Sequence, residues 1–296
     1  MKPPDEGIAM GQLSKRVQAL VPTGAKRGLQ ALRYYASDRA ALKTAKPVPL
    51  PEGFLRVYHH HIRRSGGTSV NAAFFNTGGD GFRAKEPLLA SQGWMVHGGR
   101  VFVAHNKFLI ERGEYFFARS HSPAHDVQLP AGTFTITVLR DPVQRVISHY
   151  NLLAEWEKKD VRHPSRAVEG PWLGASFTDF LARIPREHLF RQLYTFSPRL
   201  SVDEAQAALA KVDAVLVLEQ LADGLGLLGQ RLGLDLALFH EKASTPVLPV
   251  SDADRATLRD LLEPEYALLA ALSGGQNLYP RPGTSRTAAT AASSSR

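Results

Sequence analysis

The sequence contains no cysteine among its 296 residues. This absence excludes disulfide bonds, thiolate metal sites and a cysteine nucleophile. There is no run of about 18 apolar residues either, so no transmembrane helix is predicted. The N-terminus has no apolar segment followed by a signal-peptide cleavage site, and no N-x-[ST] acceptor site occurs. Together these absences predict a soluble, cytoplasmic protein in a reducing compartment.

The composition is that of a globular protein, with 44% hydrophobic and 22% charged residues. The net charge of +8 has two explanations, either basic side chains scattered over the surface or an anionic ligand. Residues 1–50 are basic and rich in alanine and end in a proline-rich stretch, which predicts a helical arm and a linker. We expect one folded domain over residues 51–275. A disordered tail is expected over 276–296, because it lacks large apolar residues after Pro280.

Hydrophobic patterns predict strands that alternate with helices. The predicted strands cover residues 54–60, 100–105, 114–119, 133–139 and 213–218. The predicted helices begin at Thr68 and at Asp141, the second with an apolar stripe of Val143, Val146, Ile147, Tyr150 and Leu153. Two more are predicted within 176–197 and one over 203–211, followed by a helix that buries Leu221, Leu225, Leu228 and Leu232. A last helix over about 252–271 is expected to bury Leu258, Leu261, Leu262 and Leu269, while 76–93 is predicted as loop. This alternation predicts an α/β fold of P-loop type, with a mostly parallel sheet and helices on both faces. Ligands in such folds bind at the carboxyl ends of the strands.

The first motif, HIRRSGGTS, covers His61 to Ser69 and lies between a predicted strand and a predicted helix. A glycine loop before a helix N-terminus is suited to an anion, because backbone N–H groups point at it and the helix dipole is positive there. The motif lacks the lysine of a nucleoside-triphosphate-binding loop before Thr68. A plain turn between strand and helix is the alternative explanation.

The second motif, TVLRDPVQRVISHY, covers Thr137 to Tyr150. Arg140 lies at the end of the clearest predicted strand, and Ser148 lies two turns into the helix that Asp141 and Pro142 begin. A guanidinium and a hydroxyl in this arrangement can bind a phosphate. The alternative is that Arg140 pairs with Asp141 or Asp126 and that Ser148 is a surface hydroxyl.

Together, the two motifs resemble those of sulfotransferases that use 3′-phosphoadenosine 5′-phosphosulfate (PAPS), and most closely the carbohydrate branch that includes heparan sulfate 2-O-sulfotransferase and its bacterial relatives. The resemblance covers about residues 54–270, and the order of the motifs agrees with that family. It implies that the first motif binds the 5′-phosphosulfate and that the second binds the 3′-phosphate. The implied cofactor-binding residues are Arg63, Arg64, Ser65, Gly66, Gly67, Thr68, Ser69, Arg140 and Ser148.

The same resemblance implies catalytic roles for Arg64 and His121. Arg64 stands where the family has a lysine, and it keeps the charge that the leaving phosphate needs but is not a readily shifted proton donor. His121 matches the family's histidine segment, and it is the candidate general base because imidazole titrates near neutral pH. His125 and Glu86 are alternative bases. Lys242 and Ser244 are candidates for a loop that covers the nucleotide.

The acceptor implied by the resemblance is a hydroxyl of a glycan or of a glycosylated small molecule. No metal site is predicted, since His59, His60 and His61 alternate faces on a strand and lack further ligands. Two other function classes stay open. One is a kinase-like P-loop phosphotransferase, which the missing lysine disfavours. The other is a non-catalytic binder of nucleic acid or another polyanion, which the net charge supports but which lacks interleaved aromatic and basic residues.

Overall fold

The computed structural model describes residues 28–32, 34, 38–45, 48–161, 163, 165–239, 248–272 and 278–279. Most of the predicted N-terminal arm and C-terminal tail lie outside the described residues, and so do Lys242 and Ser244. Within the predicted tail, Leu278 and Tyr279 form the edge strand β7. No helix in the described ranges has both the length and the apolar composition needed to cross a membrane.

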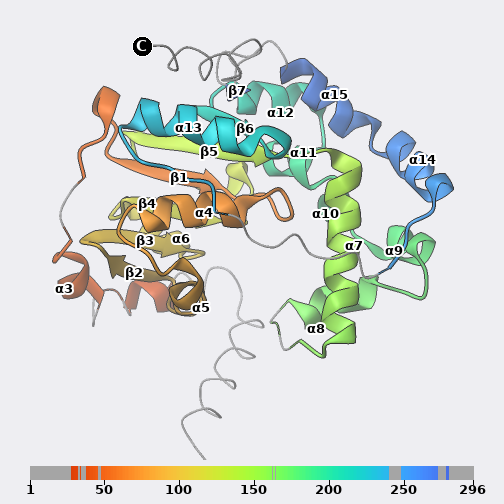
Figure 1. The fold of residues 1–296 in the computed structure, drawn as a ribbon, viewed down its shortest axis with the longest axis horizontal. Coiled ribbons are helices and arrows are strands. Elements are labelled where there is room, and N and C mark those ends of the chain that lie inside the picture. Colours follow the sequence, from red (N-terminus) through yellow and green to blue (C-terminus); the bar gives the residue numbers. More distant parts are fainter. Residues whose placement is uncertain are drawn as a thin grey trace, which may run out of the picture.

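The described residues form one sheet of seven strands in the order β2-β3-β4-β1-β5-β6-β7. All neighbouring strands are parallel except β2 and β3. The bounds are β1 Arg56–His60, β2 Trp94–His97, β3 Arg100–Ala104, β4 Phe117–Ser120, β5 Thr133–Leu139, β6 Ala214–Val217 and β7 Leu278–Tyr279. The expected α/β class with a mostly parallel sheet is therefore confirmed (Figure 1).

Both faces of the sheet are buried, because consecutive residues of a strand point to opposite sides. On β6, Leu216 packs into one apolar core and Val215 into another. The first core includes residues of α4 (Gly67–Asn76), α5 (Phe82–Gln92) and α13 (Leu221–Leu232). The second includes residues of α7 (Pro142–Lys158), α9 (Phe177–Arg183), α10 (Arg186–Leu189), α11 (Arg191–Phe196), α12 (Val202–Leu209), α14 (Asp252–Leu261) and α15 (Glu263–Leu272). A third core, beside the second, contains Tyr58 and residues of α3 (Arg39–Leu42) and α6 (Lys107–Arg112).

Helix α7 begins where the sequence predicts it. The Asp141 side chain accepts a hydrogen bond of 2.8 Å from the backbone N–H of Gln144, and Pro142 takes the first helical position. The predicted apolar stripe of this helix is buried, and it consists of Val143, Val146, Ile147, Tyr150 and Leu153. In Figure 1, α7 lies across the end of the sheet toward which β1 points.

The prediction of a loop over residues 76–93 is wrong, because α5 occupies Phe82–Gln92. Only Phe82 and Leu89 of this helix are buried, and Pro87 lies inside it. One buried residue every two turns gives little helical periodicity, and the glycines before Phe82 favour a turn. The short strand β2 follows α5 directly. All four of its residues are partly buried, so it lacks the alternation of buried and exposed positions that predicts a strand.

The C-terminal helix predicted over 252–271 is divided into α14 and α15. Pro264 follows the break, and a proline cannot continue the hydrogen bonding of a helix interior. Leu258 and Leu262 are buried as expected. Leu261, which was expected to be buried with them, is 43% exposed at the end of α14, and Leu269 is only partly buried.

Candidate functional site

Three adjacent parallel strands, β4, β1 and β5, end side by side. His60 on β1 is in register with Ser120 on β4 and with Thr137 on β5. Strands β3 and β4 lie on one side of β1 and strands β5 and β6 on the other, so the direction of chain winding reverses at β1. Such a reversal opens a crevice at the carboxyl ends of the strands, where ligands of α/β proteins bind. Both predicted motifs and His121 follow these strand ends.

The glycine loop between β1 and α4 needs both of its glycines for steric reasons. Gly66 has a φ of 75°, and a Cβ atom there would lie 2.3 Å from Cδ1 of Leu218. A Cβ atom at Gly67 would lie 2.0 Å from the imidazole Cδ2 of His61. The loop is therefore packed between Leu218 on one side and His61 on the other, and larger residues would open it.

The start of α4 offers a cradle for an anion. The first N–H groups of a helix have no partner within it, so the amides of Gly67 and Thr68 are directed to the space before the helix. The Ser65 hydroxyl oxygen is buried and has no hydrogen-bond partner in the described part of the chain. A buried hydroxyl without a partner is costly, which fits a site that a ligand completes. Thr68 and Ser69 are partly exposed on the same turn.

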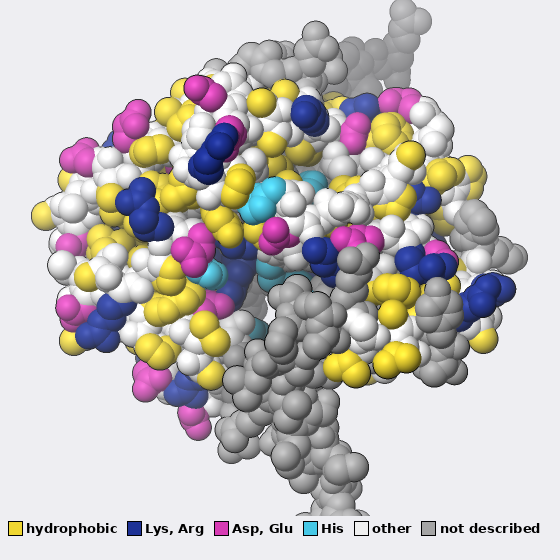
Figure 2. All heavy atoms as spheres, turned by 180° about the vertical axis from the view of Figure 1, so that it is seen from behind, with side chains coloured by type: hydrophobic (Ala, Val, Ile, Leu, Met, Phe, Trp, Pro, Cys, Tyr) yellow, Lys and Arg dark blue, Asp and Glu magenta, His cyan; other side chains and the backbone are white. Residues whose placement is uncertain are grey.

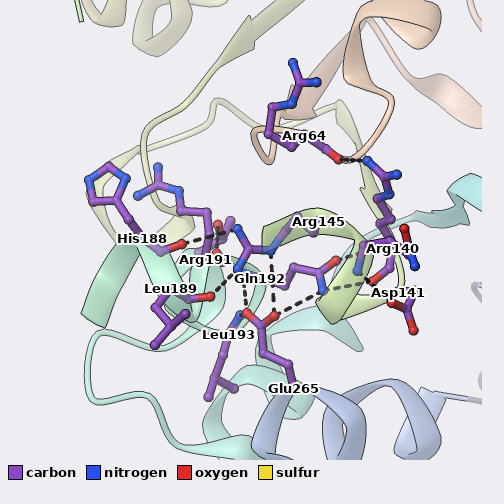
Figure 3. Close-up of polar contacts among 12 residues, drawn as sticks. Arg64, Arg140, Asp141, Arg145, His188, Leu189, Arg191, Gln192, Leu193 and Glu265 are labelled. Carbon is purple, nitrogen blue, oxygen red and sulfur yellow. Dashed lines mark hydrogen bonds and ion pairs between the residues drawn. The ribbon is translucent and has the colours of Figure 1, made fainter. Parts of the chain in front are cut away.

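The two motifs meet at Arg64. Its Nε and Nη2 donate hydrogen bonds of 3.0 Å and 2.8 Å to the Ser148 hydroxyl of α7. Its carbonyl oxygen accepts a bond of 2.9 Å from Nη1 of Arg140. Figure 3 shows this carbonyl facing Arg140 while the Arg64 guanidinium extends away from it. The structure thus brings Arg64 of the first motif together with Arg140 and Ser148 of the second, and the Arg140 guanidinium bonds the loop rather than Asp141 or Asp126. Binding of a nucleotide by these residues stays a prediction.

A buried network holds Arg140 in place from behind (Figure 3). Gln192 accepts a 2.8 Å bond from the Arg140 backbone N–H and returns a 3.0 Å bond to the Arg140 carbonyl. Glu265 on α15 accepts from the backbone N–H of Gln192 at 2.8 Å. Arg145, although part of the second motif, is only 1% exposed and donates to the carbonyls of His188 and Leu189. It therefore supports the site and does not line it.

His121 directly follows β4 and contacts the first residue of the loop. Its Nδ1 lies 2.8 Å from the carbonyl oxygen of His61. Because a carbonyl only accepts, Nδ1 carries the proton, which leaves the Nε2 lone pair free to take one up. Burial lowers the pKa of His121 well below its ordinary value, and neighbouring His105, Arg63 and Arg119 lower it further. The imidazole is therefore neutral at pH 7, the form that a general base requires.

The two alternative bases lie elsewhere. Glu86 on α5 forms an ion pair with Arg119 of β4. His125 lies in the exposed turn η3 (Ala124–Asp126), with its ring 5.5 Å from that of Tyr194. Of the three candidates, His121 is the one that is hydrogen-bonded to the residue that opens the glycine loop. Figure 2 shows histidine side chains gathered around a hollow near the middle of one face, with basic and acidic side chains beside them.

Arg63 is directed to a different place from its neighbour Arg64. It forms an ion pair with Glu169 at the end of α8 (Arg166–Glu169), a residue that no sequence pattern indicates. The other carboxylate oxygen of Glu169 lies 3.0 Å from Nε2 of His149. Binding of the cofactor by Arg63 stays a prediction, and Arg63 approaches the site from another side than Arg64.

A pocket of about 370 Å³ adjoins the glycine loop. It begins at Ser69 on α4 and is lined by Leu218, Glu219, Leu238 and Phe239. Leu218 is also the residue that packs against Gly66. The sequence does not predict this pocket, because its walls come from separate segments of the chain.

No group of three or more potential ligands among His, Cys, Asp and Glu is arranged around a common point in the described ranges. His59 and His61 point to the same side of the chain with stacked rings 5.0 Å apart. Nδ1 of His59 lies 2.9 Å from the Asn71 amide oxygen. These two rings therefore pack under the loop, against α4.

Comparison with protein-family models and with curated proteins gives no match for this chain.

Proposed function

We propose that this protein is a PAPS-dependent sulfotransferase that transfers a sulfuryl group to a hydroxyl of a glycan or a glycosylated small molecule. The observation that carries the proposal is the 2.9 Å bond from Arg140 to the Arg64 carbonyl, because it joins two anion-binding motifs at one sheet edge. The strand order supports a P-loop-type architecture, since the glycine loop follows the central strand at which the winding reverses.

The residues present fit a nucleotide with phosphates at both ends. The amides and hydroxyls of Ser65 to Ser69 would hold the 5′-phosphosulfate at the start of α4. Arg140 and Ser148 would hold the 3′-phosphate. Ser148 accepts from Arg64, so its own O–H remains a donor for that phosphate. The adjoining open pocket has room for a purine ring, with apolar contacts from Leu218 and Phe239 and polar groups from Glu219 and Gln220.

The chemistry that PAPS supplies is a sulfur atom carrying a good leaving group, the 5′-phosphate of the nucleotide. His121 Nε2 takes the proton of the acceptor hydroxyl as its oxygen attacks sulfur. Arg64 neutralises the charge that develops on the leaving phosphate, and it does so as a fixed cation, since a guanidinium does not give up its proton. The loop amides position the same phosphate in line with the attacking oxygen.

The direct test is isothermal titration calorimetry with 3′-phosphoadenosine 5′-phosphate (PAP) and with adenosine 5′-phosphate. PAP is expected to bind more tightly, because only it carries the 3′-phosphate that Arg140 and Ser148 recognise. No heat of binding at high micromolar PAP overturns the proposal. Magnesium-dependent binding of a nucleoside triphosphate would instead favour a phosphotransferase, and salt-sensitive binding of DNA without preference for PAP would favour a polyanion binder.

The acceptor and the compartment belong to the same proposal. Cytoplasmic extracts of cells with and without the protein should differ by metabolites that gain the mass of a sulfate group. Digestion of these metabolites with glycosidases then shows whether the modified hydroxyl belongs to a sugar. Sulfated products without any sugar would replace the proposed acceptor class but keep the reaction.

A further inference from the structure

Two consecutive arginines of the glycine loop point to different sides of the site. Arg64, which has a φ of 66°, directs its guanidinium to Ser148, the residue proposed to bind the 3′-phosphate. Arg63 directs its guanidinium to Glu169 instead. A left-handed backbone conformation is uncommon for residues other than glycine, and here it separates two adjacent long side chains. The two cations are therefore available for different tasks.

Helix α7 fixes both arginines through two consecutive residues. Ser148 binds Arg64 directly, and His149 binds Glu169, which in turn binds Arg63. Glu169 is 4% exposed and His149 is 2% exposed, so this chain of contacts is buried. Burial raises the pKa of Glu169, but the bond to His149 and the charge of Arg63 outweigh it and bring the pKa to about 2. The carboxylate thus stays ionised and engaged through both oxygens.

Arg63 lies on the same side as the candidate base. The ring of His121, which follows β4, lies 4.4 Å from that of His61, two residues before Arg63, and 4.8 Å from that of His105, which follows β3. The charge of Arg63 lowers the pKa of both His121 and His105. Its side chain is 16% exposed, so it is open to a ligand, and the contact with Glu169 is made by Nη1 alone. A guanidinium has five N–H donors, and the remaining ones can serve a further anionic oxygen.

On the basis of the proposed function, we propose that Arg63 binds the oxygens of the transferring sulfuryl group and that Glu169 is the positioning residue that holds Arg63 there. In the transfer, a bond forms between the acceptor oxygen and sulfur, and the bond between sulfur and the bridging phosphate oxygen breaks. The acceptor proton passes to Nε2 of His121, and the electron pair of the broken bond leaves with PAP. Arg64, whose guanidinium is bonded to Ser148 in this structure, is assigned to the leaving phosphate, and Arg63 is assigned to the group that moves.

The inference is tested by comparing PAPS with PAP, which differ only by the sulfuryl group. Calorimetric titrations at low temperature, where PAPS is stable, would measure both affinities for the wild type, Arg63→Gln, Arg64→Gln and Glu169→Gln. Arg63→Gln and Glu169→Gln are expected to weaken PAPS binding about tenfold or more and to leave PAP binding within about twofold. Arg64→Gln is expected to weaken both. Arg166→Gln, in the same helix as Glu169 but paired with Asp160 and Glu157, is the matched control.

Each outcome is decisive. Equal weakening of PAPS and PAP by Arg63→Gln would overturn the assignment of Arg63 to the sulfuryl group. An Arg63→Gln effect that Glu169→Gln does not reproduce would overturn the positioning role of Glu169. Failure of the wild type to bind either nucleotide would instead remove the proposed function itself. Should the buried Glu169→Gln variant fail to fold, Arg63→Gln alone decides the assignment of Arg63. Glu169→Asp, which keeps the charge but has a shorter side chain, then decides the positioning role. Weaker binding of PAPS with unchanged binding of PAP would support that role, and unchanged binding of both nucleotides would overturn it.

Discussion

Arg140 donates a hydrogen bond of 2.9 Å to the carbonyl oxygen of Arg64, although the two residues are 76 positions apart in the chain. The bond closes the glycine loop against the end of β5. Burial lowers the pKa of Arg140, while the charges of Glu219 and Asp141 oppose this shift. The central feature of the site is this guanidinium, which is held at a loop that is itself suited to an anion.

Replacing Arg140 by Gln should weaken PAP binding about tenfold or more, because a charge-assisted contact to the 3′-phosphate is lost. Adenosine 5′-phosphate lacks that group, so its affinity should change little. Calorimetric titration of both nucleotides measures the difference. Arg183→Gln, at an exposed arginine of α9, serves as the control. If both nucleotides lose affinity equally, Arg140 supports the loop without contacting the 3′-phosphate.

Replacing Gly67 by Ala should damage the loop without touching any charge. The new Cβ would lie 2.0 Å from the His61 ring, which must then move together with its stacked neighbour His59. Overpacking of this kind costs about 1–3 kcal/mol, and the shifted carbonyl of His61 also releases His121. Urea unfolding and PAP titration should both show losses. Gly28→Ala, at another helical glycine without a positive φ where a Cβ meets nothing within 4 Å, controls for the replacement of a glycine as such. Equal effects at the two glycines would contradict the steric explanation.

The parts of the fold that the sequence could predict are those with local signals. Thr133–Leu139 is dense in β-branched residues, and Asp141 with Pro142 marks a helix start, so the sequence predicts the bounds of β5 and the start of α7. Helix α5 carries no such signal, because only Phe82 and Leu89 need to be apolar in a helix that covers the sheet edge. Its existence depends on packing against β2 and β3, which no short window of sequence contains.

The same difference separates the site residues. The positions of the two motifs at strand ends predict that Arg64, Arg140 and Ser148 serve one pocket, but not the direct bonds that join them. Glu169 could not be predicted, because its partners Arg63 and His149 lie 106 and 20 residues away and nothing around it forms a pattern. The pocket beside Ser69 could not be predicted either, since apolar residues such as Leu218 and Phe239 fit a core as well as a ligand site.

Replacing His121 by Gln should separate binding from transfer. The base is lost, but the nucleotide contacts are not, so the PAP dissociation constant should stay within about threefold. Transfer of labelled sulfate from PAPS to the acceptor fraction of a cell extract should fall by about a hundredfold or more. His125→Gln, at an exposed histidine outside the loop, is the matched control. Full transfer activity in His121→Gln would rule out its role as the base.

Replacing Glu265 by Gln should destabilise the protein strongly. Glu265 is fully buried, lies 3.7 Å from Nε of Arg145 and accepts from two backbone N–H groups. Removing one charge of a buried pair costs about 3–5 kcal/mol, because the other charge is left without a partner. The melting temperature should therefore fall by about 10 °C. Glu263→Gln, at an exposed position of the same helix, should have little effect.

The double variant Arg145→Met with Glu265→Met sharpens this test. Two apolar side chains of similar size leave no unpaired charge, so stability should recover much of the loss seen in Glu265→Gln. A double variant as unstable as the single one would indicate that the hydrogen bonds of Glu265 to the Gln192 and Leu193 backbone matter more than its charge.

Acid should destabilise the fold through its buried histidines, and His60 offers the cleanest measurement. Its ring packs 5.7 Å from that of Phe196, away from the glycine loop, and burial lowers its pKa to about 4. The folded form is therefore neutral at pH values where the unfolded chain, with a pKa near 6.5, binds a proton. The contribution of His60 is complete above pH 6.5 and is lost as the pH falls toward 4, by about 1.4 kcal/mol per pH unit.

Urea unfolding at pH 7, 6 and 5 should show this loss as a decrease in the free energy of unfolding. In His60→Leu the slope between pH 6 and pH 5 should be shallower by about 1.4 kcal/mol per unit, whatever the stability at pH 7. His125→Leu, at an exposed site, should keep the wild-type slope. An unchanged slope in His60→Leu would mean that the folded protein admits a proton to this ring at little cost, which would require water to reach a residue that is only 5% exposed.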